Sequence, residues 1–285
     1  MSAIVVARGL CKRYGTTVAL DHVNLNIEAG RIVGLVGPNG AGKTTALKAI
    51  LGLAEFDGEL SVLGMDPRTH RDELMQQVCF IADVAVLPRW IRVAELVDFV
   101  GGVHPRFSRE KCQAFLARTK IQPTQRVREL SKGMIVQLHL ALVMAIDAKL
   151  LVLDEPTLGL DILYRKEFYN RLLSDYFDHE KTILVTTHQI EEVEHILTDL
   201  LFIREGRIVL DASMDAVGER FAEVMVHPDQ AEAARALKPL HERQIFGKYI
   251  FLFDGADRAR LAQLGELHKP SVADLFVATM QGTYA

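Results

Sequence analysis

The stretch GPNGAGKTT, residues 37–45, follows directly on the apolar run IVGLV, residues 32–36. Residues Gly37 to Thr44 fit the pattern G-x-x-x-x-G-K-[ST] of a phosphate-binding loop. Glycines let the backbone curl so that successive N–H groups point at an anion, and a following helix adds the positive end of its dipole. Lys43 supplies a charge for the β- and γ-phosphates, and the Thr44 hydroxyl can ligate Mg²⁺. The alternative, a glycine-rich turn that matches by chance, is disfavoured by the strand before the loop and the helix after it.

A second motif is the apolar strand LLVLDEP, residues 150–156, which ends in two carboxylates. Asp154 at the tip of this strand can hold the Mg²⁺ shell. Glu155 can polarise a water molecule for attack on the γ-phosphate. Taken alone, the stretch also fits an ordinary transition from a strand to a loop. Its position downstream of a phosphate loop makes the catalytic interpretation the stronger one.

A third motif is LSKGM, residues 130–134, which a helix follows at once. Ser131 is a natural N-cap, and the free N–H groups behind it form another anion site. A capped helix with no ligand is the simpler interpretation of this stretch in isolation.

In this order the motifs resemble the nucleotide-binding subunit of an ABC transporter, over residues 1 to about 211. Tyr14 in KRYG occupies the place of the aromatic residue that stacks on adenine, and LSKGM occupies the place of the signature LSGGQ. TLGLD, residues 157–161, resembles the loop between the two subunits, and His188 resembles the switch histidine. The resemblance implies nucleotide contacts from Tyr14, Gly37, Pro38, Asn39, Gly40, Ala41, Gly42, Lys43, Thr44 and Thr45, and contacts from Ser131 and Gly133 to the ATP that the other copy holds. It also implies metal contacts from Thr44, Asp154 and Asp83, and catalytic roles for Glu155, His188 and Lys43.

The sequence departs from the family pattern at two places. The signature has Lys132 and Met134 where glycine and glutamine are usual, and this variant resembles the ABC-2 type export branch. The strand VCFIAD ends in Asp83 where the family has a metal-binding glutamine. Aspartate is shorter and adds negative charge, so Asp83 either ligates Mg²⁺ directly or acts through water.

Composition sets the class of the protein. The chain has 285 residues, and 49% of them are hydrophobic, which is typical of a globular protein. Its net charge of −4 gives no surplus of basic residues for binding nucleic acid. Its three cysteines form no CxxC pair, which favours a reducing compartment. We find no secretory signal, and the longest apolar run, Leu138 to Ile146, is too short to span a bilayer. We therefore expect a cytoplasmic protein, and the resemblance implies that it is peripheral on the inner face of the cell membrane through the permease.

The periodicity of the chain predicts an α/β fold with a mostly parallel central sheet. The resemblance makes this a P-loop NTPase domain over residues 1–211, with an N-terminal antiparallel β subdomain and a helical subdomain inserted at about 84–147. Residues 212–285 read as a small α+β accessory domain. The predicted strands are 3–9, 18–27, 31–36, 58–63, 77–82, 149–153, 182–187, 200–204, 207–210, 222–226, 242–246 and 248–252, and the predicted helices include 43–53, 161–178, 230–237, 257–263 and 271–280.

The resemblance implies a subunit that binds and hydrolyses ATP with Mg²⁺, dimerises around two ATP molecules with a second such subunit, and powers the transmembrane permease of an ABC-2 type exporter. Trp90, the only tryptophan, then docks on that permease or packs in the core. The alternatives are a soluble ATPase of the same superfamily that acts on ribosomes or DNA, and a non-catalytic interaction module. A metal site along residues 188–195, on one helix face, is a weaker interpretation than a phosphate-sensing His188.

Overall fold

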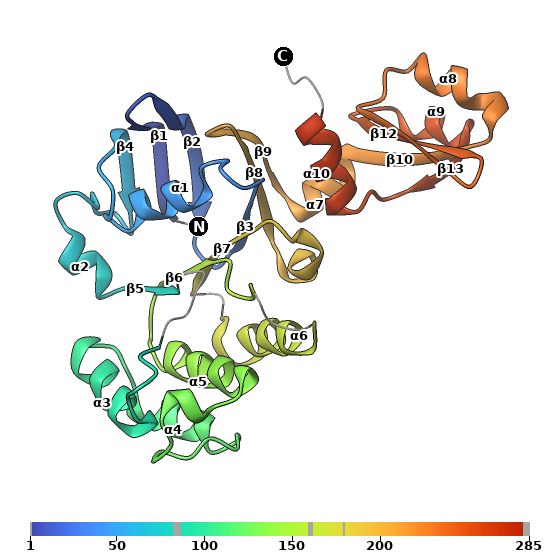
Figure 1. Cartoon of the computed structure of the whole chain (residues 1–285). Helices are drawn as coiled ribbons and strands as arrows, with labels where there is room; N and C mark the ends of the chain where they lie inside the picture. The colour runs from blue at the N-terminus through green and yellow to red at the C-terminus, as the bar shows by residue number, and fades with distance from the viewer. Residues whose placement is uncertain (1, 82–86, 159–161, 179, 282–285) are drawn as a thin grey trace.

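The computed structural model describes residues 2–81, 87–158, 162–178 and 180–281, which form three β-sheets (Figure 1). The N-terminal sheet and the central sheet lie together, several helices gather at one end of them, and the third sheet stands to one side (Figure 1). The predicted α/β fold with a mostly parallel central sheet is therefore confirmed.

The central sheet positions the chemistry. In spatial order its strands are β5 (Val78–Ile81), β6 (Leu150–Asp154), β7 (Thr182–Thr187), β3 (Ile32–Val36), β8 (Asp199–Arg204) and β9 (Arg207–Ser213). All neighbours are parallel except β8 and β9, which form an antiparallel hairpin. Strands β3, β6 and β7 are buried along their whole length, as their apolar residues on both faces require. Because parallel strands end at one edge, the loops after β3, β6 and β7 meet there.

The N-terminal sheet is antiparallel, in the order β2-β1-β4, and comprises β1 (Ala3–Tyr14), β2 (Thr17–Glu28) and β4 (Asp57–Val62). Helix α1 (Lys43–Ile50) shares one hydrophobic core with this sheet and with the near face of the central sheet. The short helix α2 (Arg71–Met75) precedes β5. This packing fixes the phosphate loop between two sheets.

The helical block between β5 and β7 comprises α3 (Val93–Val103), α4 (Arg109–Leu116), a 3₁₀ turn (Val127–Glu129), α5 (Lys132–Met144) and α6 (Ile162–Arg171), the last continued by a π-helical turn (Leu172–Tyr176). These helices pack with the far face of the central sheet in a second core. None of the helices in the described ranges is both long and apolar enough to cross a lipid bilayer.

The C-terminal part has the chain order β-α-β-β-α-β after helix α7 (Met214–Arg220). Its antiparallel sheet has the order β11-β12-β10-β13, formed by β10 (Phe221–Val226), β11 (His241–Ile245), β12 (Lys248–Asp254) and β13 (Gly265–His268), with α8 (Ala231–Arg235) and α9 (Arg258–Ala262) between strands. This order is that of a split β-α-β fold of the ferredoxin-like type. Helix α10 (Val272–Gln281) then returns to the central sheet, where the Phe276 and Phe202 rings lie 5.2 Å apart.

Several predicted element boundaries were wrong, for local reasons. Strand β1 continues beyond residue 9 to Tyr14. A bulge places Asp21 and His22 opposite Cys11, and regular pairing with β2 resumes after the bulge, so the strand does not end there. The residues after His188 form two 3₁₀ turns (Ile190–Glu192 and Glu194–Ile196) in place of an α-helix. The spacing of residues 188–195 therefore does not build the single helix face on which the alternative metal site depended. Helices α2 and α7 and strand β13 were not predicted.

A partly buried histidine in α5, His139, gives stability a pH dependence. The Nδ1 atom of His139 is enclosed without a hydrogen-bond partner among the described residues, and burial lowers the pKa of the ring to about 4. The unfolded chain takes up a proton below its ordinary pKa of about 6.5, whereas the folded chain does not until about 4. The contribution of His139 to the free energy of unfolding is therefore complete above the pKa of the unfolded chain, and it is lost as the pH falls toward the pKa of the folded chain.

We expect His139→Leu to reduce this loss. Between about pH 7 and pH 5 the native chain should lose about 2 kcal/mol more of its unfolding free energy than the variant does, because leucine has no proton to bind. Urea unfolding of both proteins at the two pH values measures this difference. If the unfolding free energies of the two proteins change equally with pH, His139 is not the source of this pH dependence.

Candidate functional site

The phosphate loop joins the end of β3 to the start of α1, at the edge where the parallel strands end (Figure 1). Gly40 has φ 82° and Gly42 has φ 110°, both in the region that favours glycine. A Cβ on Gly42 would lie 2.4 Å from the carbonyl oxygen of Ala19, so no larger residue fits there. The loop is thus able to present its N–H groups, and the start of α1, to an anion.

The ammonium group of Lys43 lies above this loop. The residue is only 6% exposed, and its Nζ donates hydrogen bonds to the carbonyl oxygens of Gly37 at 2.7 Å and Pro38 at 3.3 Å. Nζ also lies 3.7 Å from Glu155 Oε1. A buried ammonium group needs such partners because an unpaired charge is costly away from water. The contacts hold a positive charge between the phosphate loop and the end of β6.

Thr44 and Asp154 form an oxygen pair beside Lys43. The Thr44 hydroxyl donates to Asp154 Oδ2 at 3.0 Å, and the Thr186 hydroxyl donates to the other oxygen of that carboxylate. A hydroxyl and a carboxylate are hard oxygen ligands of the kind that Mg²⁺ prefers, so the pair fits a magnesium ion. Asp83, the third predicted metal ligand, lies outside the described residues.

Glu155 and His188 face each other at the ends of β6 and β7. Glu155 Oε2 lies 2.9 Å from His188 Nδ1, and the Glu155 N–H donates to the carbonyl oxygen of Thr186 at 3.1 Å. The backbone of Glu155 has φ 49°, a left-handed conformation that costs about 1–3 kcal/mol for a residue with a side chain. Surrounding contacts therefore hold this carboxylate in a conformation that the free chain avoids.

One pocket of about 500 Å³ opens over these groups. It is lined by Thr17, Val18, Ala19, Asn39, Gly40, Ala41, Gly42, Lys43, Thr44, Thr45, Glu155, Leu158 and His188. The structure thus brings together most of the predicted phosphate-loop contacts with Glu155 and His188. Gly37 and Pro38 do not line the pocket, but their carbonyl groups bind Lys43.

Three predicted nucleotide contacts lie away from this pocket. Tyr14, at the end of β1, is exposed and has Lys12 Nζ 5.2 Å from its ring centre. Ser131 caps α5 and accepts a hydrogen bond from the N–H of Met134 at 3.3 Å. Gly133 lies against Tyr164, so closely that a Cβ would come 2.2 Å from the ring. No residue of α5 lines the pocket of its own chain.

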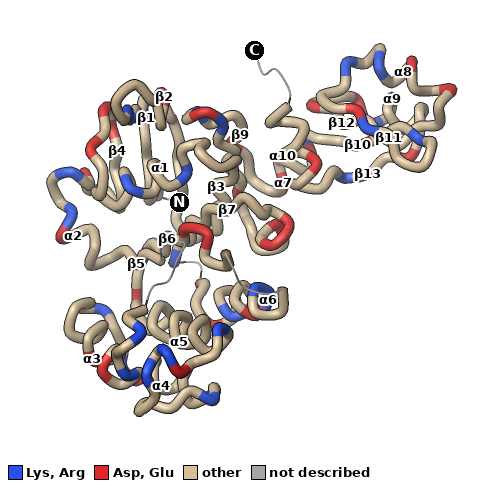
Figure 2. Tube along the Cα trace, viewed as in Figure 1, with Lys and Arg blue, Asp and Glu red and all other residues tan. Residues whose placement is uncertain are grey.

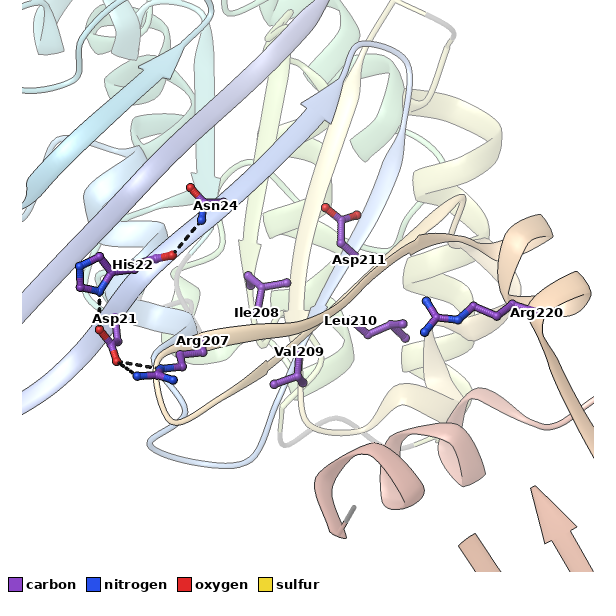
Figure 3. A pocket seen from close by; sticks show the side chains of 9 residues that line it. All are labelled: Asp21, His22, Asn24, Arg207, Ile208, Val209, Leu210, Asp211 and Arg220. Atoms are coloured by element: carbon purple, nitrogen blue, oxygen red, sulfur yellow. Dashed lines mark hydrogen bonds and ion pairs between the residues drawn. The ribbon is translucent and has the colours of Figure 1, made fainter. Parts of the chain in front are cut away.

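A different hollow, of about 560 Å³, lies between β2 and β9 (Figure 3). Its charged groups bind one another: Arg207 Nε donates to Asp21 Oδ2 at 2.7 Å, and His22 Nδ1 lies 2.7 Å from Asp21 Oδ1. These two hydrogen bonds, that of His22 first, hold the pKa of Asp21 below its usual range. Asp21, His22 and Cys11 lie close enough to share an ion, but Arg207 already neutralises the carboxylate. We assign these contacts a structural role.

Sequence reasoning missed some of the groups around the phosphate pocket. Thr186 binds both the Asp154 carboxylate and the Glu155 N–H, and Thr17 and Leu158 line the pocket. The pair of threonines that ends the strand TILVTT was a signal for Thr186, because polar residues at the end of a buried parallel strand face the site edge. Thr17 lies in a strand that is remote in sequence, and no motif marks it.

The comparisons with known proteins point in one direction. Residues 20–158 match the family described as ABC transporter. The chain is 34% identical to "Nod factor export ATP-binding protein I" of Paraburkholderia xenovorans, with 93% of each chain covered. It is 27% identical to "ABC transporter ATP-binding protein YtrB" of Bacillus subtilis, with 94% of this chain and 92% of that protein covered.

Solved structures share the fold. An ATP-binding subunit of an ABC transporter superposes with a TM-score of 0.66 at 23% identity, over 76% of this chain and 92% of that one. The cbiO1 protein from Clostridium perfringens, described as part of the transporter complex cbiONQ, gives a TM-score of 0.66 at 24% identity, over 83% of this chain and 95% of that one.

Proposed function

Because this chain belongs to the ABC transporter family, as an ATP-binding subunit with ATPase activity, we propose how it works. Two copies close around ATP and drive an export permease of the ABC-2 type. The observation that supports the proposal most directly is the single pocket lined by the phosphate loop, Glu155 and His188. The relatives named for Nod factor export, together with the LSKGM signature, favour export as the direction. The same names favour a transporter over a soluble ATPase that acts on ribosomes or DNA.

In the proposed reaction Glu155 is the general base. Its carboxylate takes a proton from a water molecule while the water oxygen attacks the γ-phosphorus of ATP. The bond from the γ-phosphorus to the bridging oxygen breaks, which yields ADP and inorganic phosphate, and the proton then leaves Glu155 for solvent. His188 orients the carboxylate through Nδ1 and keeps its other ring nitrogen for the γ-phosphate. Lys43 balances the charge on the phosphates.

Magnesium is the metal that the residues fit. Thr44 and Asp154 would hold it through their oxygens, with Asp83 as a third candidate ligand. When bound, Mg²⁺ neutralises the charge that the β- and γ-phosphates carry.

Dimerisation would complete the site. Ser131 and Gly133 lie at the start of α5, away from the pocket of their own chain, where they can reach the ATP held by a second copy. Leu158, which lines the pocket, is an exposed apolar residue, and Ile162 and Leu163 at the start of α6 are exposed as well. Burying these side chains against a partner would favour association. Adenine would stack on Tyr14, which is exposed at the end of β1.

We place the permease contact at the helical block. Trp90 is 69% exposed, which disfavours the core alternative, and Phe99 and Val103 on one face of α3 are exposed as well. Exposed apolar side chains within one helical block favour a protein interface there. The subunit would thereby be held at the inner face of the membrane. We propose the helical subdomain, at about 84–147, as its docking part, and residues 1–211 and 212–285 as ATPase and accessory domains.

Replacing Trp90 with alanine tests this function. The chain is purified in detergent together with its neighbouring membrane protein, and ATPase activity is measured with and without that protein. We expect the complex that carries Trp90→Ala to lose most of the permease-dependent stimulation of ATPase activity, because the substitution removes a large apolar contact. Basal activity and melting temperature should change little, because the side chain is exposed.

The matched control is Phe246→Ala, which removes a fully exposed aromatic residue from the hairpin between β11 and β12. That variant should keep full stimulation. Recovery of ribosomes or DNA in place of a membrane protein would support the soluble alternative and reject the proposed function. If Trp90→Ala lowers basal activity and stability together, Trp90 belongs to the core and the docking surface is wrong.

A further inference from the structure

The side chain of Glu192 joins three segments beside the phosphate pocket. Its Oε2 accepts a hydrogen bond from the Thr157 hydroxyl at 3.1 Å, and its Oε1 pairs with the guanidinium group of Arg165 on α6. The same guanidinium nitrogen donates to Gln189 Oε1 at 2.7 Å. One carboxylate and one guanidinium group thus connect the loop after β6, the loop after β7 and helix α6.

This pair is more protected than a surface ion pair. The side chains of Arg165 and Glu192 are 24% and 19% exposed. Thr157 is buried, and its hydroxyl lies 3.3 Å from the hydroxyl of the fully buried Tyr169. Charged hydrogen bonds in such a partly buried network are stronger than exposed ones, and their geometry is better fixed.

The position of the pair along the chain gives it a consequence for the chemistry. Thr157 follows Glu155 by two residues, and Gln189 directly follows His188. Glu155 and His188 are the two side chains that face each other across the pocket, at 2.9 Å. A clamp on Thr157 and Gln189 therefore limits how far the two loops can move apart. Neither Arg165 nor Glu192 lines the pocket.

We propose that Arg165 and Glu192 are positioning residues for ATP hydrolysis, which hold the loop of Glu155 in register with the loop of His188. The inference rests on the proposed catalytic function of this pocket. Loss of the clamp lowers the rate of the chemical step and leaves ATP binding intact, because the phosphate loop and Lys43 are held by other contacts.

The test compares variants of the full chain with ATP and Mg²⁺ as probes. We expect Glu192→Ala to lower kcat between about 10- and 100-fold, since a misplacement near 1 Å can have an effect of this size. KM and the dissociation constant of a non-hydrolysable ATP analogue should change less than about twofold, which is within the spread for a distant contact. Glu192→Gln, which keeps the size of the side chain and can still accept from Thr157, should have a smaller effect on kcat.

Two further variants separate positioning from stability. The charge-reversed pair Arg165→Glu with Glu192→Arg should recover part of the lost kcat. Glu167→Ala is the matched control, because Glu167 forms an ion pair with Arg171 on the same helix and has no hydrogen bond to either loop among the described residues. That variant should keep the native kcat.

Each outcome has one meaning. If the native chain hydrolyses ATP and both Glu192 variants keep its kcat, the clamp is overturned while the proposed function stands. The clamp is also overturned if the Glu192 variants lose kcat only in proportion to folded protein and the reversed pair restores nothing. A native chain without ATPase activity, even with its permease, would reject the proposed function itself.

Discussion

Glu155→Gln should reduce ATP turnover by about 10²–10⁴-fold, the usual contribution of a general base. Glutamine has nearly the size of glutamate and can still bond to His188, but it cannot take a proton from water. The phosphate loop and Lys43 are unchanged in this variant, so ATP should still bind. Because the γ-phosphate persists, we expect two copies to remain closed around ATP as a trapped dimer.

Two measurements on the purified variant decide this result. Phosphate release at saturating ATP and Mg²⁺ gives kcat, and light scattering after size-exclusion chromatography gives the mass with ATP and with ADP. The control is Glu191→Gln, which alters an exposed carboxylate just after His188 that does not line the pocket. It should leave both properties unchanged. Rapid turnover by the Glu155 variant would remove Glu155 from its role, and a monomer with ATP would argue against dimerisation.

The second large effect is expected for Lys43→Met. This change removes the positive charge beside the phosphate loop and keeps much of the side-chain volume. A charged hydrogen bond is worth about 1.5–3 kcal/mol, so the loss of the contacts to two phosphates should weaken ATP binding by at least about 10²-fold. Hydrolysis should fall with binding, since the phosphate charge is no longer balanced.

Fluorescence titration with a labelled ATP analogue measures the affinity of the Lys43 variant. Lys48→Met, in the last turn of the same helix α1, is exposed and serves as the control. Because Lys43 is buried, the melting temperature of each variant is recorded as well. Native affinity in a folded Lys43 variant would show that this residue does not bind the phosphates.

The phosphate loop could be predicted from the sequence because such a loop depends on local backbone geometry. Glycines at positions 40 and 42, a lysine and a threonine must follow one another along the chain, so they are readable as a motif. Buried strands that end in polar residues are readable for the same reason. Element boundaries were less accurate: β1 passes through a bulge at Cys11, and pairing with β2 across that bulge is a property of two strands together.

What the sequence could not give is the set of contacts between segments that are far apart along the chain. The clamp connects Glu192 and Arg165 with Thr157 and Gln189. Taken alone, each of these is an ordinary polar residue on a loop or helix. The hydrogen bonds of the Glu155 N–H group to Thr186, in the neighbouring strand, are likewise contacts of this kind.

The sequence by itself determined the phosphate loop, the two carboxylates at the end of β6 and the α/β class of the fold, because these depend on residues adjacent in the chain. Only the tertiary structure decided that Glu155 meets Lys43 and His188, whereas the place of Ser131 and Gly133 away from their own pocket agrees with the resemblance. The reason is physical. Parallel pairing of β3, β6 and β7 brings their ends to one edge of the sheet, whereas α5 packs in the hydrophobic core on the far face of that sheet.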